Sequence, residues 1–135
     1  MDINESLDHI LCAADTLGKL FFEHFLDAHP EMRPHFQNAD YARLHALLAT
    51  ALMVIARHYI DPEPAVEEYL QYLGRKHCEM GIRGNDYDKW GESMMASLAR
   101  FHGDQWTPHL RDQWQEAIGK ATKLLLDGYE RDAAA

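Results

Sequence analysis

The stretch "RKHCEMGI" at residues 75–82 decides how the chain is interpreted, because it puts a histidine where the helical pattern predicts an apolar residue. Upstream, apolar residues recur at helical spacing along one face, namely Val66, Tyr69, Leu70 and Leu73. His77 comes next on that face. An imidazole held against a core needs a hydrogen-bond partner or a ligand. The sequence therefore raises the question of which partner His77 has.

The rest of the chain shows helical periodicity too, and no alternating run of β-branched residues predicts a strand. The segment "PEMRPHFQNAD" at residues 30–40 is rich in turn formers. Asp40, "ND" at residues 85–86 and Thr107-Pro108 are expected to start helices. Helices are expected over about residues 3 to 14, 15 to 30, 40 to 59, 64 to 81, 85 to 101, and from 107 onward. We predict an all-α fold of six to seven helices in a single domain covering residues 1–135.

The composition is that of an ordinary globular protein, with 47% hydrophobic and 26% charged residues. A net charge of −9 argues against nucleic acid and anionic membranes as partners. The start of the chain lacks the pattern of a signal peptide, and no apolar run approaches the roughly 20 residues that span a bilayer. Cys12 and Cys78 are expected to be reduced thiols. We expect a soluble, cytoplasmic protein that does not bind membranes.

Nine histidines in a chain of this length make metal sites the first chemistry to consider. The sequence contains no HExxH, CxxC or CxxCH motif, so zinc sites and covalently attached haem lack support. It also has no Ser-His-Asp, paired-carboxylate or phosphate-loop signature, and no catalytic residue is assigned. Seven histidines are interpreted as surface or structural residues: His9, His24, His29, His35, His58, His102 and His109.

His45 resembles His77 in its setting, since it heads a helical stripe that continues through Leu48, Leu52 and Ile55. Each histidine could be a neutral core residue bonded to a carbonyl group. Alternatively, both could face one apolar cavity that holds a haem, with an imidazole as axial ligand. Apolar residues for the wall of such a cavity are available: Phe22, Phe25, Phe36, Leu48, Ala49, Met80, Ile82, Met94, Met95 and Leu98.

Four segments give the chain a family resemblance. "FFEHFLDAHPEMRPHF", "RKHCEMGI", "YDKWGESMMASL" and "RDQWQEAIGKA" occur in the order, and with the spacing, of globin sequences. Over about residues 7 to 131 the chain resembles bacterial single-domain haemoglobins and the haem domain of flavohaemoglobins. The resemblance implies a globin fold around haem b, with His77 as the proximal iron ligand and His45 as a second candidate ligand. The haem contacts it implies are Phe22, Phe36, His45, Leu48, Ala49, Lys76, His77, Ile82, Tyr87 and Met94.

On the proximal side, the resemblance implies a hydrogen bond between Tyr87 and the free ring nitrogen of His77. The family often adds a glutamate from the last helix, and here that position falls on Tyr129, with Glu130 beside it. On the opposite, distal side, Phe22 stands where many of these proteins have a ligand-binding tyrosine. His45 matches the distal position, so it could donate to bound oxygen or bind the iron as a sixth ligand. Ala49 would leave the distal pocket roomy.

The function implied is reversible binding of oxygen, carbon monoxide, nitric oxide or another small haem ligand. One alternative is a nitric oxide dioxygenase or weak peroxidase. It would need an external reductase, because 135 residues leave no room for the reductase domain of flavohaemoglobins. Further alternatives are a haem-based redox or gas sensor and a globin fold that has lost its haem.

Overall fold

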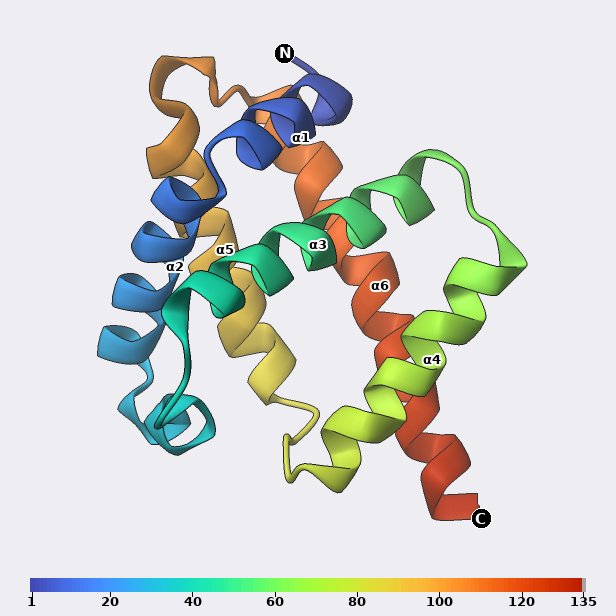
Figure 1. The fold of residues 1–135 in the computed structure, drawn as a ribbon. Coiled ribbons are helices and arrows are strands. Elements are labelled where there is room, and N and C mark those ends of the chain that lie inside the picture. Colours follow the sequence, from blue (N-terminus) through green and yellow to red (C-terminus); the bar gives the residue numbers. More distant parts are fainter. Residues whose placement is uncertain (135) are drawn as a thin grey trace.

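The computed structural model describes residues 1–134, with side chains up to Glu130, and this part of the chain contains helices and no strand. The prediction of an all-α fold is confirmed (Figure 1). The elements are α1 (Ile3–Cys12), α2 (Ala14–Ala28), η1 (Pro30–Phe36), α3 (Tyr41–Ile60), α4 (Pro64–Glu79), α5 (Asp86–His102), η2 (Gly103–Gln105) and α6 (Pro108–Ala134). The two η elements are 3-10 helices.

Two of the three predicted helix starts have the expected capping side chain. The Asp40 carboxylate accepts from two first-turn N–H groups of α3 at 3.0 and 3.4 Å. The Thr107 hydroxyl accepts at 3.2 Å from an N–H group of α6. The prediction was wrong at Asn85, which makes no capping bond. There the Asp86 carboxylate accepts at 2.9 Å from the Arg83 N–H instead, so it closes the turn before α5 rather than capping the helix.

The segment expected as a turn, residues 30–40, contains the 3-10 helix η1. Pro30 opens it and Pro34 lies inside it, and proline cannot donate the backbone hydrogen bonds of a longer α-helix. Asn38 then adopts a positive φ of 64°, a left-handed conformation that asparagine tolerates better than most residues. This reversal directs the chain into α3.

The helices form two packed groups that α3 connects. α2 lies against α5 and α3, while α4 lies along α6, which also contacts α3 (Figure 1). The core contains an inner stripe of α6, of which Leu110, Trp114, Ala117 and Ala121 are at most 1% exposed. Within residues 1–134 no single helix has the length and apolarity to cross a bilayer; η1 and α3 meet those criteria only as a pair bent by 106°.

A buried polar cluster fixes α1 against α5 and α6. The Trp114 indole N–H donates to the Ser6 hydroxyl at 2.9 Å, and that hydroxyl lies 2.6 Å from Nε2 of His102. Since Ser6 accepts from Trp114, its own proton is available for His102, whose pKa is lowered by burial. His102 therefore serves as a structural histidine, as the sequence predicted.

Two glycines let α4 and α6 approach each other backbone to backbone. A Cβ atom at Gly74 would overlap the Leu125 carbonyl group, and a Cβ atom at Gly128 would overlap the Gln71 carbonyl group. Neither obstacle is a flexible side chain, so a larger residue at either position would have to push the helices apart. The position of α4, which carries His77, therefore depends on these glycines.

We predict that Gly74→Ala lowers the free energy of unfolding by about 1–3 kcal/mol, the usual cost of overpacking. Gly119→Ala on α6 is the matched control, because nothing lies within 4 Å of the added Cβ atom. The control should gain about 0.5–1 kcal/mol from improved helix propensity. Urea denaturation of both variants measures the difference. Equal stabilities would show that the helices do not meet at Gly74.

Candidate functional site

His77 lies in the last turn of α4 with one ring nitrogen hydrogen-bonded and the other without a partner. Its Nδ1 lies 2.9 Å from the Tyr87 hydroxyl, so the hydrogen bond implied by the resemblance is present. Its Nε2 makes no hydrogen bond to any residue whose side chain the structure describes. The ring is partly buried and can therefore use Nε2 to bind another group.

The backbone after His77 places this histidine at the end of the helix. The N–H groups of Met80 and Ile82 both donate to the His77 carbonyl, at 3.1 and 3.0 Å. Between them Gly81 adopts a φ of +88°, which favours glycine. The turn therefore brings Ile82 back beside His77.

The Tyr87 hydroxyl has a second neighbour, the Tyr129 hydroxyl, at 3.2 Å. Tyr129, near the end of α6, also donates to the Ile82 carbonyl at 2.8 Å. Tyr129 thus takes the place where the resemblance implied a glutamate, while Glu130 is exposed. Three segments, α4 with its turn, α5 and α6, converge on His77 through these contacts.

The three side chains joined by these hydrogen bonds, His77, Tyr87 and Tyr129, are electrically neutral near neutral pH. Burial lowers the pKa of His77, which favours the uncharged imidazole that binds metal ions. Burial raises the pKa of Tyr87, and the hydrogen bond with Tyr129 raises it further. Burial also raises the pKa of Tyr129. Both phenols therefore keep their protons.

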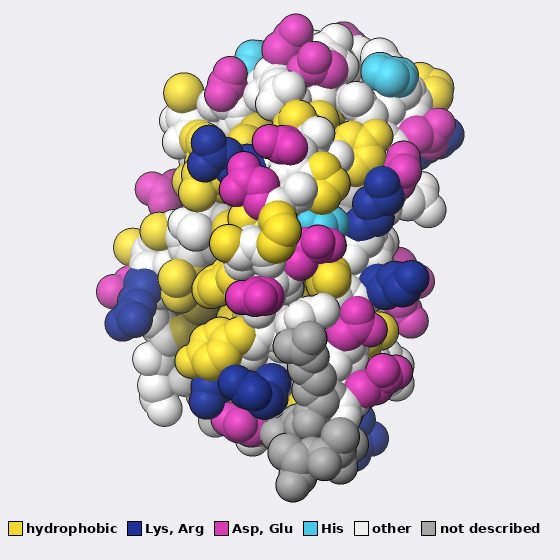
Figure 2. Space-filling view, turned by 90° about the vertical axis from the view of Figure 1, so that its right-hand side faces the viewer, with side chains coloured by type: hydrophobic (Ala, Val, Ile, Leu, Met, Phe, Trp, Pro, Cys, Tyr) yellow, Lys and Arg dark blue, Asp and Glu magenta, His cyan; other side chains and the backbone are white. Residues whose placement is uncertain are grey.

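Most of the expected wall residues are buried or partly buried apolar side chains. Phe22 on α2 packs edge-on against Phe36 with ring centres 5.4 Å apart. Leu48 and Ala49 are buried on α3, and Met94 is fully buried on α5. On the face that α4 forms, hydrophobic side chains surround a hollow at the left of the view (Figure 2). α3 and α4 share few direct contacts although they are consecutive helices.

One expected wall residue, Met80, and one expected haem contact, Lys76, lie toward the solvent. Met80 is 64% exposed, so its expected place in an apolar wall was wrong: it caps the end of α4, where the chain turns away from the core. Lys76 forms an exposed ion pair with Glu79 at 3.3 Å and lies over the Tyr72 ring. Ile82 is partly buried and packs on the core from the turn after α4.

His45 lies at the contact between α3 and α2. Its Nδ1 is 3.2 Å from the Asp15 carboxylate, and its ring stacks on Phe22 with centres 6.0 Å apart. A Cβ atom at Gly18 would overlap the His45 ring, so the ring depends on that glycine for its space. Asp15 was not predicted from the sequence as a partner of His45, although Asp15, Gly18 and Phe22 share one face of the predicted helix.

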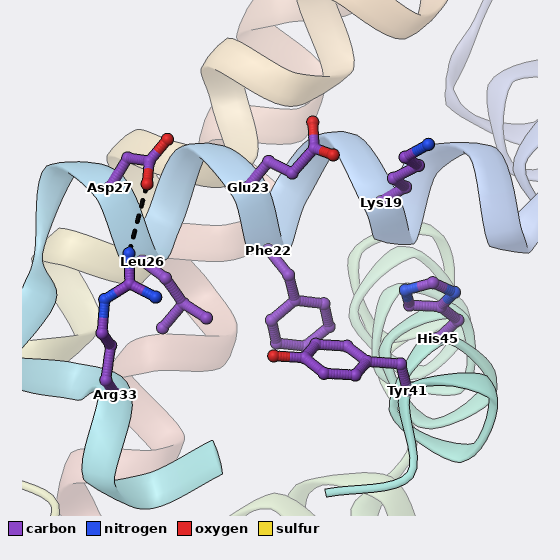
Figure 3. A pocket seen from close by; sticks show the side chains of 8 residues that line it. All are labelled: Lys19, Phe22, Glu23, Leu26, Asp27, Arg33, Tyr41 and His45. Carbon is purple, nitrogen blue, oxygen red and sulfur yellow. Dashed lines mark hydrogen bonds and ion pairs between the residues drawn. The ribbon is translucent and has the colours of Figure 1, made fainter. Parts of the chain in front are cut away.

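A cavity of about 400 Å³ opens beside these residues, between α2, η1 and the start of α3 (Figure 3). Phe22, Tyr41 and His45 form its aromatic side, and the Arg33–Asp27 ion pair at 3.2 Å bounds it at the other end.

The residues present fit the haem that the resemblance implies. Haem needs one imidazole with a free nitrogen and an apolar wall. His77 offers the imidazole, and buried apolar residues of α2, α3 and α5 are available for the wall. Among the described residues there is no cluster of three or more His, Cys, Asp or Glu side chains that could hold a metal ion.

Comparison with known proteins also identifies the globin family. The sequence profile of the Globin family matches residues 19–124. The chain is 30% identical to a flavohemoprotein of Bordetella parapertussis and 29% identical to one of Rhizobium meliloti, over 87% and 78% of its own length. It spans 29% and 26% of those two proteins.

Among solved structures, the chain resembles a Pseudomonas aeruginosa protein described as structurally highly homologous to human hemoglobin. The TM-score is 0.77 at 23% sequence identity, covering 92% of this chain and 98% of the other. At this identity the likeness concerns the fold.

Proposed function

We propose that this chain, which belongs to the globin family, is a haem b protein that reversibly binds oxygen or another diatomic gas. The family assignment confirms the resemblance recognised in the sequence. The haem would supply the iron at which the gas binds, and the residues of this chain would set its environment.

The observation that carries the proposal is the arrangement of the His77 ring. Tyr87 occupies Nδ1 and leaves Nε2 free, which is how a histidine that ligates a metal is usually held. The lowered pKa of His77 favours the neutral form needed for that role. We therefore assign His77 as the proximal iron ligand, with Phe22, Phe36, Leu48, Ala49, Ile82 and Met94 as apolar neighbours of the haem.

On the distal side we propose an apolar surface with an open sixth iron position. Phe22 has no proton to donate to a bound gas. His45, the other candidate, contacts Asp15 through Nδ1 only, which leaves its Nε2 available, but the stack on Phe22 and the tight contact with Gly18 hold its ring against α2. These contacts favour an open iron site over bis-histidine coordination.

The nature of residue 22 favours gas binding over the enzymatic alternatives. Turnover as a dioxygenase or peroxidase benefits from a distal group that polarises bound oxygen, and Phe22 cannot supply one. Such turnover would also need electrons from a donor. Assaying nitrate during repeated additions of nitric oxide, with oxygen and an external electron donor present, distinguishes the two functions: a dioxygenase forms many nitrate ions per haem, whereas a gas carrier forms about one.

We predict that His77→Ala weakens haem binding by about 10–100-fold or more, since losing even a partner of a metal ligand has an effect of that size. Absorption spectra of the oxidised, reduced and carbon monoxide-treated protein, together with haem transfer to an acceptor, measure it. His109→Ala, at an exposed position of α6, is the control. A variant His77→Ala with an unchanged spectrum would overturn the assignment of the proximal ligand.

Phe22→Tyr should slow oxygen dissociation about fivefold or more, because a new hydrogen bond to the bound gas contributes about 1 kcal/mol. Phe22→Leu removes the ring without adding a donor and separates the hydroxyl from a change in volume. Stopped-flow displacement of oxygen by carbon monoxide gives both rates. If neither variant alters the rate, residue 22 does not face the gas.

We expect His45→Ala and Asp15→Asn to leave the reduced iron five-coordinate and high-spin, as in the unsubstituted chain. The reason is that the stack on Phe22 and the tight contact with Gly18 hold the His45 ring against α2. Absorption spectra without added gas test this. A low-spin, six-coordinate spectrum that His45→Ala abolishes would instead establish His45 as the sixth ligand.

A further inference from the structure

We propose that Tyr129 is a positioning residue that fixes the direction of the hydrogen bonds through Tyr87, so that His77 keeps its proton on Nδ1 and presents a bare Nε2. The inference rests on the proposed function in one respect, that the bare nitrogen is meant for iron. The direction of the hydrogen bonds itself does not depend on haem.

The Ile82 carbonyl lies at the end of these hydrogen bonds and can only accept a hydrogen bond. The Tyr129 hydroxyl has one proton, and it lies 2.8 Å from that carbonyl but 3.2 Å from the Tyr87 oxygen. The shorter contact, to a carbonyl oxygen, takes the proton. Tyr129 can then only accept from Tyr87.

The direction continues to His77. Because the Tyr87 proton points to Tyr129, the Tyr87 oxygen is left as the acceptor for Nδ1, 2.9 Å away. The proton of the imidazole must therefore be on Nδ1. The reverse direction would use the Tyr87 proton on Nδ1 and leave two phenol oxygens 3.2 Å apart with no proton between them.

These contacts form a closed circuit. The Ile82 N–H donates back to the His77 carbonyl at 3.0 Å, so the same residue holds the backbone of His77 and ends its side-chain hydrogen bonds. Movement of the turn after α4 would therefore alter the orientation of the His77 ring.

The side-chain hydrogen bonds that begin at His77 end on a neutral group, the Ile82 carbonyl, rather than on a carboxylate. Asp86, next to Tyr87, has its carboxylate oxygens engaged by the Arg83 N–H at 2.9 Å and by Lys89 at 3.1 Å. Tyr87 and Tyr129 are phenols, which are neutral near pH 7. A neutral terminus leaves His77 a plain imidazole, whereas an anionic one would increase its basicity toward the iron.

The first test measures the tautomer of His77 in the haem-free full chain by ¹⁵N NMR of labelled histidines, with the helical content checked by circular dichroism. We expect Nδ1 to carry the proton. In Tyr129→Phe the acceptor is gone and Tyr87 is free to donate to Nδ1, so the tautomer ratio should shift toward Nε2–H. The shift should be about fivefold or more, the ratio equivalent to one net hydrogen bond.

Tyr59→Phe is the matched control. Tyr59 on α3 also reaches α6, through a contact of 3.4 Å with Glu116, but takes no part in the circuit. It should leave the His77 tautomer unchanged. A predominantly Nε2-protonated His77 in the unsubstituted chain, or no shift in a helical Tyr129→Phe, would overturn the proposal.

A second test uses the haem-loaded chain and decides the matter if the haem-free chain lacks helical structure. Tyr129→Glu should raise the iron–histidine stretching frequency of the reduced protein and lower its reduction potential, while Tyr129→Phe should not raise the frequency. An unchanged frequency in Tyr129→Glu counts against the proposal. If the chain binds no haem but has the expected tautomer, only the proposed function fails.

Discussion

The hydrogen bond between His77 and Tyr87 is the contact on which the site depends. An imidazole on a core-facing side of α4 is costly to bury unless its nitrogens find partners. The 2.9 Å contact satisfies one nitrogen, and the turn at Gly81 brings α5 back so that Tyr87 can make it. The end of α4, the turn and the start of α5 are thus arranged around one side chain.

The two sides of the expected haem position differ in chemistry. The proximal side has a chain of phenols ending on a backbone carbonyl, whereas the distal side has Phe22 packed on Phe36. In the proposed arrangement, the proximal hydrogen bonds orient His77, and a bound gas would meet Phe22, which has no proton to donate. An apolar neighbour of this kind would favour release of the gas over its activation.

The sequence predicted the helices, the caps at Asp40 and Thr107, and the pairing of His77 with Tyr87. These features follow from local periodicity, from short-range capping and from a resemblance that covers the chain. The orientation of His45 could not be predicted in the same way. On α3, Leu44 and His45 are neighbours that begin two adjacent stripes of residues. The contact of His45 with Asp15 is selected by the space above Gly18, which lies on a different helix, α2. Likewise, Asn85 makes no capping bond at the start of α5, and the Asp86 carboxylate closes the turn before the helix instead.

The position of Tyr129 shows why the end of the proximal chain could not be derived from spacing alone. Tyr129 follows Gly128, the residue at which α6 meets the backbone of α4. Since that crossing has no room for a side chain, the next residue of α6 lies close to the end of α4 and its turn. The Tyr129 hydroxyl then reaches the Ile82 carbonyl and Tyr87 together. A helix–helix contact made possible by two glycines therefore determines which atom ends the hydrogen bonds of His77, and a shift of either helix would be transmitted to the imidazole.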